Sequence, residues 1–308
     1  DTCIKFSGSV YADVTNSASS TSIAGTYDLY LTVMSNTDAG ALKGYAGMSG
    51  GTLVDKAYVQ FGGLSAGKQT AITKIYGVGG NQGGAQYGNP TDSIYYSMPV
   101  GGATVSVGMS NPGTHSTDAD DYDWSGTDKP DLAASLSMKA GAADVAVAAV
   151  SHDAVASDDG SHANGWAVLG KVGFSADAVS VTAFGGYASG ATSYINSGVT
   201  KDGFNADYAG TSAGLDFAER FDGENVTGTA AGIQATYKLG NINLGLLYAT
   251  ASLNNTDGAA KNDQINAFAT YTVAKGLTVT PELLQTNVDV VGDKYTSNTV
   301  YVRIARDF

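Results

Sequence analysis

The last nine residues of the chain alternate in a way that constrains its fold. Counting back from Phe308, every second side chain as far as Val300 is apolar except Arg306, and the positions between them include Asp307 and Arg303. Side chains of a strand point alternately to opposite faces, so this ending predicts a β-strand with one apolar face. Arg306 departs from the pattern, but it lies two residues from the end, where a long side chain can reach a polar boundary. An ordinary buried last strand is the alternative interpretation.

The composition favours a transmembrane β-barrel over a helical membrane protein. The 308 residues include 41 Gly, 18 Tyr and only 5 Pro, and the mean hydropathy is −0.06. The sequence has no apolar run of 18 or more residues, so it encodes no transmembrane helix. A barrel needs no such run, because its lipid-facing and lumen-facing residues alternate, and its aromatic girdle suits a terminal phenylalanine.

The net charge and the cysteine content limit the partners and the covalent crosslinks that the chain can have. The formal charge is −13, from 29 acidic and 16 basic residues, which argues against nucleic acid as a partner because nucleic acid binding needs a basic face. The single cysteine, Cys3, excludes an intrachain disulfide. No signal peptide is visible, as expected of an exported chain from which it has already been removed.

Alternating segments recur along the whole chain, from Cys3–Val14 to Tyr295–Phe308. Seven short and eight long connections separate them, which predicts sixteen antiparallel strands in a single transmembrane barrel domain over residues 1–308. Short periplasmic turns and longer extracellular loops are the usual construction of such barrels. Fourteen or eighteen strands are the alternatives, because Ser189–Val226 is long and poorly patterned and Asp216–Phe221 is a candidate for an irregular strand.

The two faces of the predicted strands differ in chemistry. The outward set is apolar and includes Val105, Val107, Met109, Leu132, Leu136, Met138, Trp166, Val168, Val172, Val179, Val181, Tyr187, Ile242, Leu244, Leu246 and Tyr248. The inward set is small or polar and includes Ser106, Ser135, Ser137, Ser180, Thr182, Gln234, Thr236, Lys238, Thr280 and Glu282. A closed soluble barrel packs branched apolar residues inside. The reversed pattern predicts water in the middle and lipid around.

Two stretches resemble alphaproteobacterial general porins: residues 1–13, DTCIKFSGSVYAD, and residues 56–69, KAYVQFGGLSAGKQ. The resemblance implies a sixteen-stranded homotrimer in the bacterial outer membrane that passes small hydrophilic solutes and contacts outer-membrane lipid and lipopolysaccharide. It also implies a third loop folded into the lumen. Many relatives carry a second cysteine that this chain lacks. Relatives also line the third loop with acids, whereas residues 71–90 contain no Asp or Glu.

The candidate pore residues lie in this third loop and on the inward faces. The loop candidates are Lys74, Asn81, Gln82, Gln86 and Tyr87. Alternation assigns these charged residues to the inner wall: Lys5, Lys43, Lys56, Lys68, Lys171, Lys238, Arg303, Asp13, Asp28 and Glu282. Lys68 is the best wall candidate, because the matching family position is basic. A flexible surface loop, and charges that merely solvate a wide lumen, are the alternatives.

Acidic residues alternate in the loop that contains Asp118, Asp120, Asp121 and Asp123. Such carboxylates could bind Ca²⁺ outside the cell, but a full calcium-loop signature is missing, so a plain solvated loop is the alternative. No cofactor is required. His115, His152 and His162 all lie in predicted long loops, and nothing marks a catalytic site around them.

Two hypotheses follow. The first is a general diffusion porin with a weak preference for cations, because the negative charge lies mostly in the loops. The second is a structural or adhesive outer-membrane barrel with a plugged lumen.

Overall fold

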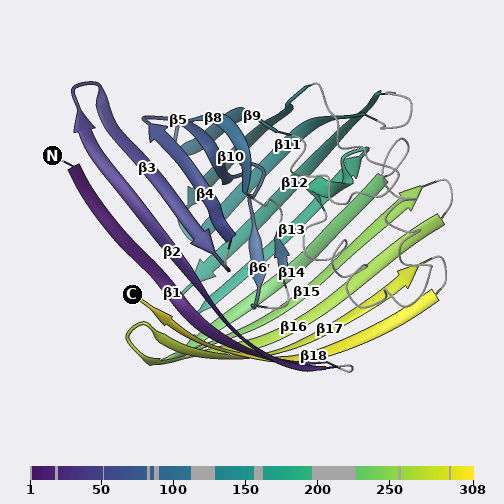
Figure 1. Ribbon diagram of the computed structural model, residues 1–308. Helices are drawn as coiled ribbons and strands as arrows, with labels where there is room; N and C mark the ends of the chain where they lie inside the picture. Colours follow the sequence, from purple (N-terminus) through teal and green to yellow (C-terminus); the bar gives the residue numbers. More distant parts are fainter. Residues whose placement is uncertain are drawn as a thin grey trace.

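The computed structural model describes residues 2–17, 20–50, 52–81, 84–86, 90–111, 129–155, 162–195, 227–255, 258–290 and 293–308. Nearly all of them lie in antiparallel β-strands (Figure 1). No helix within these ranges is long and apolar enough to cross a membrane.

Sixteen of the described strands close into one barrel in the order β1-β18-β17-β16-β15-β14-β13-β12-β11-β10-β9-β8-β5-β4-β3-β2. The strands of the first half are β1 (Thr2–Asn16), β2 (Thr21–Thr37), β3 (Gly40–Ser49), β4 (Thr52–Phe61), β5 (Leu64–Thr70), β8 (Pro90–Val100), β9 (Ala103–Ser110) and β10 (Asp131–Ala140). The second half consists of β11 (Ala143–Val155), β12 (His162–Ala176), β13 (Val179–Ser189), β14 (Thr227–Leu239), β15 (Ile242–Asn255), β16 (Gly258–Ala274), β17 (Leu277–Val290) and β18 (Asp293–Asp307). Two short strands, β6 (Gly77–Gly79) and β7 (Gly84–Gln86), form a separate sheet. The prediction of a sixteen-stranded antiparallel barrel is confirmed.

Tight turns join the strands at one end of the barrel. Gly101 and Gly102 connect β8 to β9 with φ of 56° and 87°, the left-handed pair that a two-residue hairpin turn requires. Asp177, with φ of 50°, fills the same role between β12 and β13, as Asp tolerates this conformation. Turns as tight as these agree with the short connections that the sequence predicts at one end of the barrel.

The two ends of the chain close the barrel. Phe308 N donates to Gly8 O at 3.0 Å and Gly8 N donates to Phe308 O at 3.2 Å, and the ladder continues from Ser9 opposite Asp307 to Asn16 opposite Val300. A Cβ on Gly8 would lie 2.3 Å from the carbonyl oxygen of Asp28, so the seam needs glycine at this position. Arg306 lies on the outer face and donates from Nη1 to Lys275 O at 2.5 Å. It thus reaches the backbone of a turn.

The outer face is the apolar one, as expected. Large exposed side chains on it include Phe6, Ile23, Leu136, Val172, Leu246, Leu283, Ile304 and Phe308. Paired residues of neighbouring strands share a face, so the register places Leu132, Met109 and Ile94 in one outward row. The alternation in the sequence therefore predicts the lipid-facing surface correctly.

The inner wall is less polar than expected over β11 to β15. Val150, Leu169, Phe184 and Leu247 point inward and are buried, together with small residues such as Ala148, Ala167, Ala188, Ala230, Ala249 and Ala251. The prediction of a uniformly small or polar lumen is wrong here. These side chains are covered by two segments that fold against the wall, described next.

Candidate functional site

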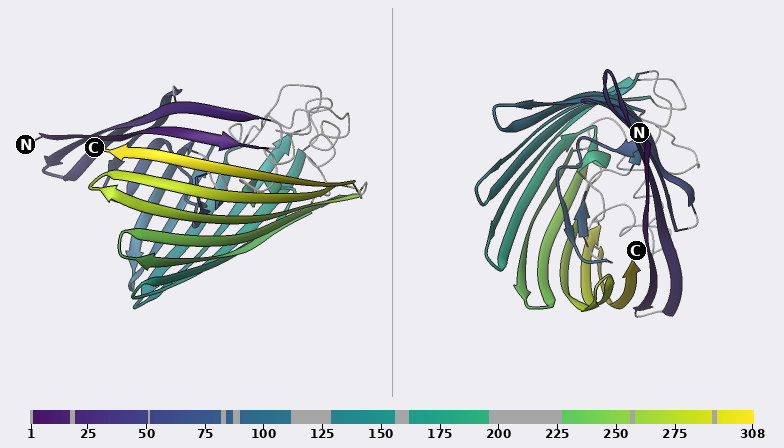
Figure 2. Two further views of the ribbon diagram at one scale, coloured as in Figure 1. Left: turned by 90° about the horizontal axis from the view of Figure 1, so that it is seen from below. Right: turned by 90° about the vertical axis from the view of Figure 1, so that its left-hand side faces the viewer.

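The segment between β5 and β8 enters the ring of strands. In the right-hand view of Figure 2 its short strands β6 and β7 lie inside the barrel. It begins with a turn in which Lys74 N donates to Ala71 O at 3.0 Å. Its described parts, residues 71–81 and 84–86, form what we call the lumen loop.

The first part of the lumen loop is held by apolar packing. The ring of Tyr76 stacks on the inward-facing Phe184 of β13, with ring centroids 4.5 Å apart. Tyr76 is buried, and Ile75 and Val78 pack against the same apolar cluster. Burial raises the pKa of Tyr76 to about 12, so its phenol is neutral under all physiological conditions.

The second part is held by hydrogen bonds from its backbone to the wall. Gly79 N donates to Oε1 of Gln234 on β14. Gly80 N donates to Oδ1 of Asn266 on β16 at 2.9 Å, and Asn81 N donates to Oε2 of Glu282 on β17 at 2.5 Å. Three consecutive N–H groups therefore find acceptors on three strands, so the loop needs no acid of its own to be anchored.

Glu282 is the centre of this anchor. Its side chain is only 1% exposed, and its second oxygen, Oε1, accepts from Asn266 Nδ2 at 2.7 Å. A Cβ on Gly80 would lie 2.4 Å from the Glu282 carboxyl group. Only glycine lets the loop backbone approach the carboxylate this closely.

The anchor continues to the seam of the barrel through Arg303. Its Nε and Nη2 donate to the two carboxylate oxygens of Asp13, each at 2.7 Å, and its Nη1 donates to Oδ1 of Asn81 at 3.2 Å. The guanidinium lies over the ring of Tyr11, 3.9 Å from the centroid. Bidentate pairing and ring contact fix the guanidinium, so it presents a defined donor to the loop.

A barrel that is apolar outside and has a loop anchored across its inner wall is the architecture of outer-membrane channels. A family model described as "Porin subfamily" matches residues 1–305. The chain belongs to the porin family. No curated protein matches the sequence.

Solved structures share the fold of this porin at low sequence identity. The outer membrane channel DcaP of Acinetobacter baumannii is 17% identical, with a TM-score of 0.77 over 100% of this chain and 97% of that one. An anion-selective porin from Comamonas acidovorans is 12% identical, with a TM-score of 0.68 over 100% of both chains. OmpF of Salmonella typhi, solved in complex with daunomycin, is 11% identical, with a TM-score of 0.65 over 99% of this chain and 97% of that one.

Three sequence-predicted pore residues meet in this porin: Asn81, Glu282 and Arg303 form one hydrogen-bonded network. Other predicted residues on the inner wall lie apart from it. Asp28 accepts from Ser49 Oγ at 2.5 Å, Lys171 Nζ lies 2.6 Å from Asp144 Oδ2, and Lys5, Lys43, Lys56 and Lys238 also share the inward faces of their strands. Gln86 belongs to β7, with only its backbone described, and Gln82 and Tyr87 lie outside the described residues.

Lys68 is not a wall residue of the lumen. It pairs with Ala57 and with Asp92, and this row shares the face of the outward-pointing Leu64 and Ile94. Its assignment to the lumen is therefore wrong. The residues of β5 that do point inward are Ser65 and Gln69, both buried.

A second segment, residues 191–195 after β13, also lies against the inner wall. Ala191, Tyr194 and Ile195 belong to the buried apolar cluster. The Tyr194 hydroxyl donates to Asp131, whose other oxygen lies 2.8 Å from His152 Nδ1. His152 belongs to β11 and His162 begins β12, which corrects their prediction as loop residues, and His115 is outside the described residues.

The predicted calcium ligands Asp118, Asp120, Asp121 and Asp123 lie outside the described residues. Within the described part of the chain, no three metal-ligating side chains lie together. Sequence reasoning assigned Gln234 to the inner wall but missed Asn266 and the Tyr76–Phe184 stack. The phase of β16 could have indicated Asn266, whereas no sequence signal pairs Tyr76 with Phe184.

Replacing Glu282 tests the anchor. Glu282→Ala should free the lumen loop, because it leaves the N–H of Asn81 without its acceptor, a loss of about 1–3 kcal/mol for a buried polar group. We expect larger fluctuations of the open-channel current in planar bilayers. Gly80→Ala should have the same effect through the clash with the carboxylate. Gly170→Ala, on the open outer face of β12, is the matched control, and equal current noise in all three variants would contradict the anchor.

Proposed function

We propose that this porin is a general diffusion channel, which lets small hydrophilic solutes and ions cross the bacterial outer membrane passively. The observation that carries the proposal is the anchoring of the lumen loop along one wall, from Phe184 on β13 to Arg303 on β18. A loop held at the wall narrows a water-filled lumen by its shape. Its Gly and amide groups favour uncharged polar solutes over strongly charged ones.

The same proposal covers the subfamily of the chain, the lipid around it and its binding of metal ions. We place the chain among the alphaproteobacterial general porins, on the resemblance of residues 1–13 and 56–69. Outer-membrane lipid surrounds the apolar outer face of the barrel, and lipopolysaccharide forms the outer leaflet of that membrane. The function needs no resident cofactor, and Ca²⁺ binding by Asp118, Asp120, Asp121 and Asp123 is a further proposal on their charge alone.

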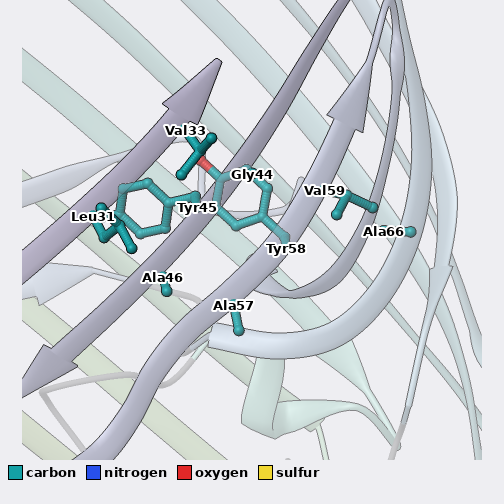
Figure 3. A pocket seen from close by; sticks show the side chains of 9 residues that line it. All are labelled: Leu31, Val33, Gly44, Tyr45, Ala46, Ala57, Tyr58, Val59 and Ala66. Atoms are coloured by element: carbon teal, nitrogen blue, oxygen red, sulfur yellow. The ribbon is translucent and has the colours of Figure 1, made fainter. Parts of the chain in front are cut away.

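We also propose that the functional unit is a homotrimer formed through β2 to β5. The outer face there carries a shallow apolar depression of about 450 Å³ among small residues such as Gly44, Ala46, Ala57 and Ala66 (Figure 3). Small residues let backbones of membrane proteins approach closely. Lys68 and Asp92 border the same face, and charged groups suit a contact between subunits better than lipid chains.

Solute uptake tests the diffusion channel. Liposomes that contain the purified protein should swell in monosaccharides and much more slowly in a trisaccharide, because the loop restricts the lumen. Deleting residues 79–84 should admit the trisaccharide, since it removes the wall-anchored part of the loop. A plugged adhesive barrel would give no swelling in any sugar, and unchanged exclusion after the deletion would show that the loop does not set the size limit.

Reversal potentials in asymmetric KCl test the ion preference. The net charge of −13 lies mostly in loops and should enrich cations at the channel mouth. The lumen bases offset this charge, so we expect weak cation preference that fades as salt shortens the Debye length from about 30 Å at 0.01 M to about 10 Å at 0.1 M. Clear anion preference at low salt would contradict this prediction.

A bulky side chain in the depression tests the trimer. We expect native mass spectrometry in mild detergent to give three copies of the 31.2 kDa chain. Gly44→Trp should shift the protein to single chains, because the ring fills the space that a neighbour would occupy. Gly170→Trp is the control, since Gly170 is also open on the outer face but lies on β12. A wild-type protein that is monomeric under these conditions would refute the homotrimer.

A further inference from the structure

Three tyrosines stand side by side on the inner face of β2, β3 and β4. The rings of Tyr45 and Tyr58 are stacked with centroids 5.1 Å apart, and those of Tyr30 and Tyr45 with centroids 5.9 Å apart. Figure 3 shows the rings of Tyr45 and Tyr58 beside each other. All three side chains are partly exposed, so the stack borders the lumen instead of being sealed within a core.

Lysines flank this stack. Lys43 Nζ lies 5.5 Å from the ring centroid of Tyr58 and 5.9 Å from that of Tyr45, and 3.4 Å from the Tyr58 hydroxyl. Lys56 precedes Tyr58 by two residues on the same face of β4. Lys5 reaches the same row, because it pairs with Thr32 and Thr32 pairs with Tyr45. We call Tyr30, Tyr45, Tyr58, Lys43 and Lys56 the tyrosine–lysine strip.

The two inward-facing acids of β1 and β2, Asp28 and Asp13, already accept hydrogen bonds. Asp28 lies two residues before Tyr30 on β2 and accepts from Ser49 Oγ at 2.5 Å and Ser9 Oγ at 3.5 Å. The second inward acid on these first strands, Asp13, is held by Arg303. Because Lys5, Lys43 and Lys56 outnumber Asp28 on this part of the inner face, the strip is a locally basic surface in a chain whose net charge is −13.

The chemistry of the strip selects for one class of solute. The stacked rings offer a flat apolar surface that is partly exposed at the lumen. Phenol hydroxyls and ammonium groups add hydrogen-bond donors there. A cation gains little, because Lys43 already occupies the position near the ring faces. An anion with a flat apolar body satisfies both the donors and the rings.

We propose that the tyrosine–lysine strip binds small planar organic anions of the aromatic carboxylate class as they pass through the lumen. The carboxylate pairs with Lys43 or Lys56, and the aromatic body lies along the tyrosines. The anchor keeps residues 76–81 against β13 to β18, away from these strands. This inference rests on the proposed diffusion channel and names one class of solute that binds to the wall during its passage.

Titration of the channel current tests the strip. Current through the purified wild-type protein in fixed KCl is measured with increasing benzoate, and separately with cyclohexanecarboxylate, which has the same charge and a similar size but no aromatic plane. An aromatic contact corresponds to about fivefold in affinity. We therefore expect benzoate to reduce the current at a concentration about fivefold lower than cyclohexanecarboxylate.

Variants distinguish the contribution of the tyrosine rings from that of the lysine charge. Tyr45→Leu with Tyr58→Leu should abolish the difference between the two anions, and Lys43→Gln should weaken block by both. Tyr295→Leu on β18 and Lys139→Gln on β10 are the controls. Both anions should block these two variants as they block the wild-type protein. Equal block by both anions in wild type, or an equal loss in Tyr295→Leu, would overturn the inference while the channel itself stands. A protein that carries no current would overturn the proposed function as well.

Discussion

The structure depends on a closed ladder of backbone hydrogen bonds, because lipid offers the backbone no other hydrogen-bond partners. In hydrocarbon no water can satisfy an exposed N–H or C=O group, so a spanning sheet must have no free edge. The antiparallel seam between β1 and β18 provides this closure, from Ser9 opposite Asp307 to Asn16 opposite Val300. Because the ladder holds the wall, the side chains are free to specialise, with apolar ones outside and a lumen inside that is available for function.

The seam also participates in the lumen. Arg303 belongs to the last strand and pairs with Asp13 of the first, while its remaining donor meets Asn81 of the lumen loop. Glu282 on the adjacent strand accepts from the loop backbone. The carboxylate that anchors the loop therefore comes from the wall, and the loop carries no acid of its own. A loop without acids narrows the lumen without setting up the strong transverse field that acids facing basic wall residues would produce.

Alternation in the sequence predicted the strands, their number and their outer face, because a period of two is imposed by strand geometry wherever one face meets lipid. It failed where both faces are apolar. Residues 145–150 read VAVAAV, and this run does not reveal that Ala148 and Val150 receive a loop segment from inside. Lys68 was misplaced because the two-residue turn after Phe61 exchanges odd and even positions, so that Gln60 shares a face with Ser65 and Lys68 shares the outer face with Ala57. Glu282, Asn81 and Arg303 were proposed singly, but their meeting depends on the path of the loop, which no local pattern encodes.

We infer that the barrel encloses continuous water beside a loop anchored to its wall. Single-channel conductance of the purified wild-type protein in planar bilayers, recorded over a series of KCl concentrations, tests it most directly. We expect discrete conductance steps that rise in proportion to the bulk conductivity of the salt solution, as in an aqueous pore. Absent steps, or a conductance that saturates at low salt, would contradict it.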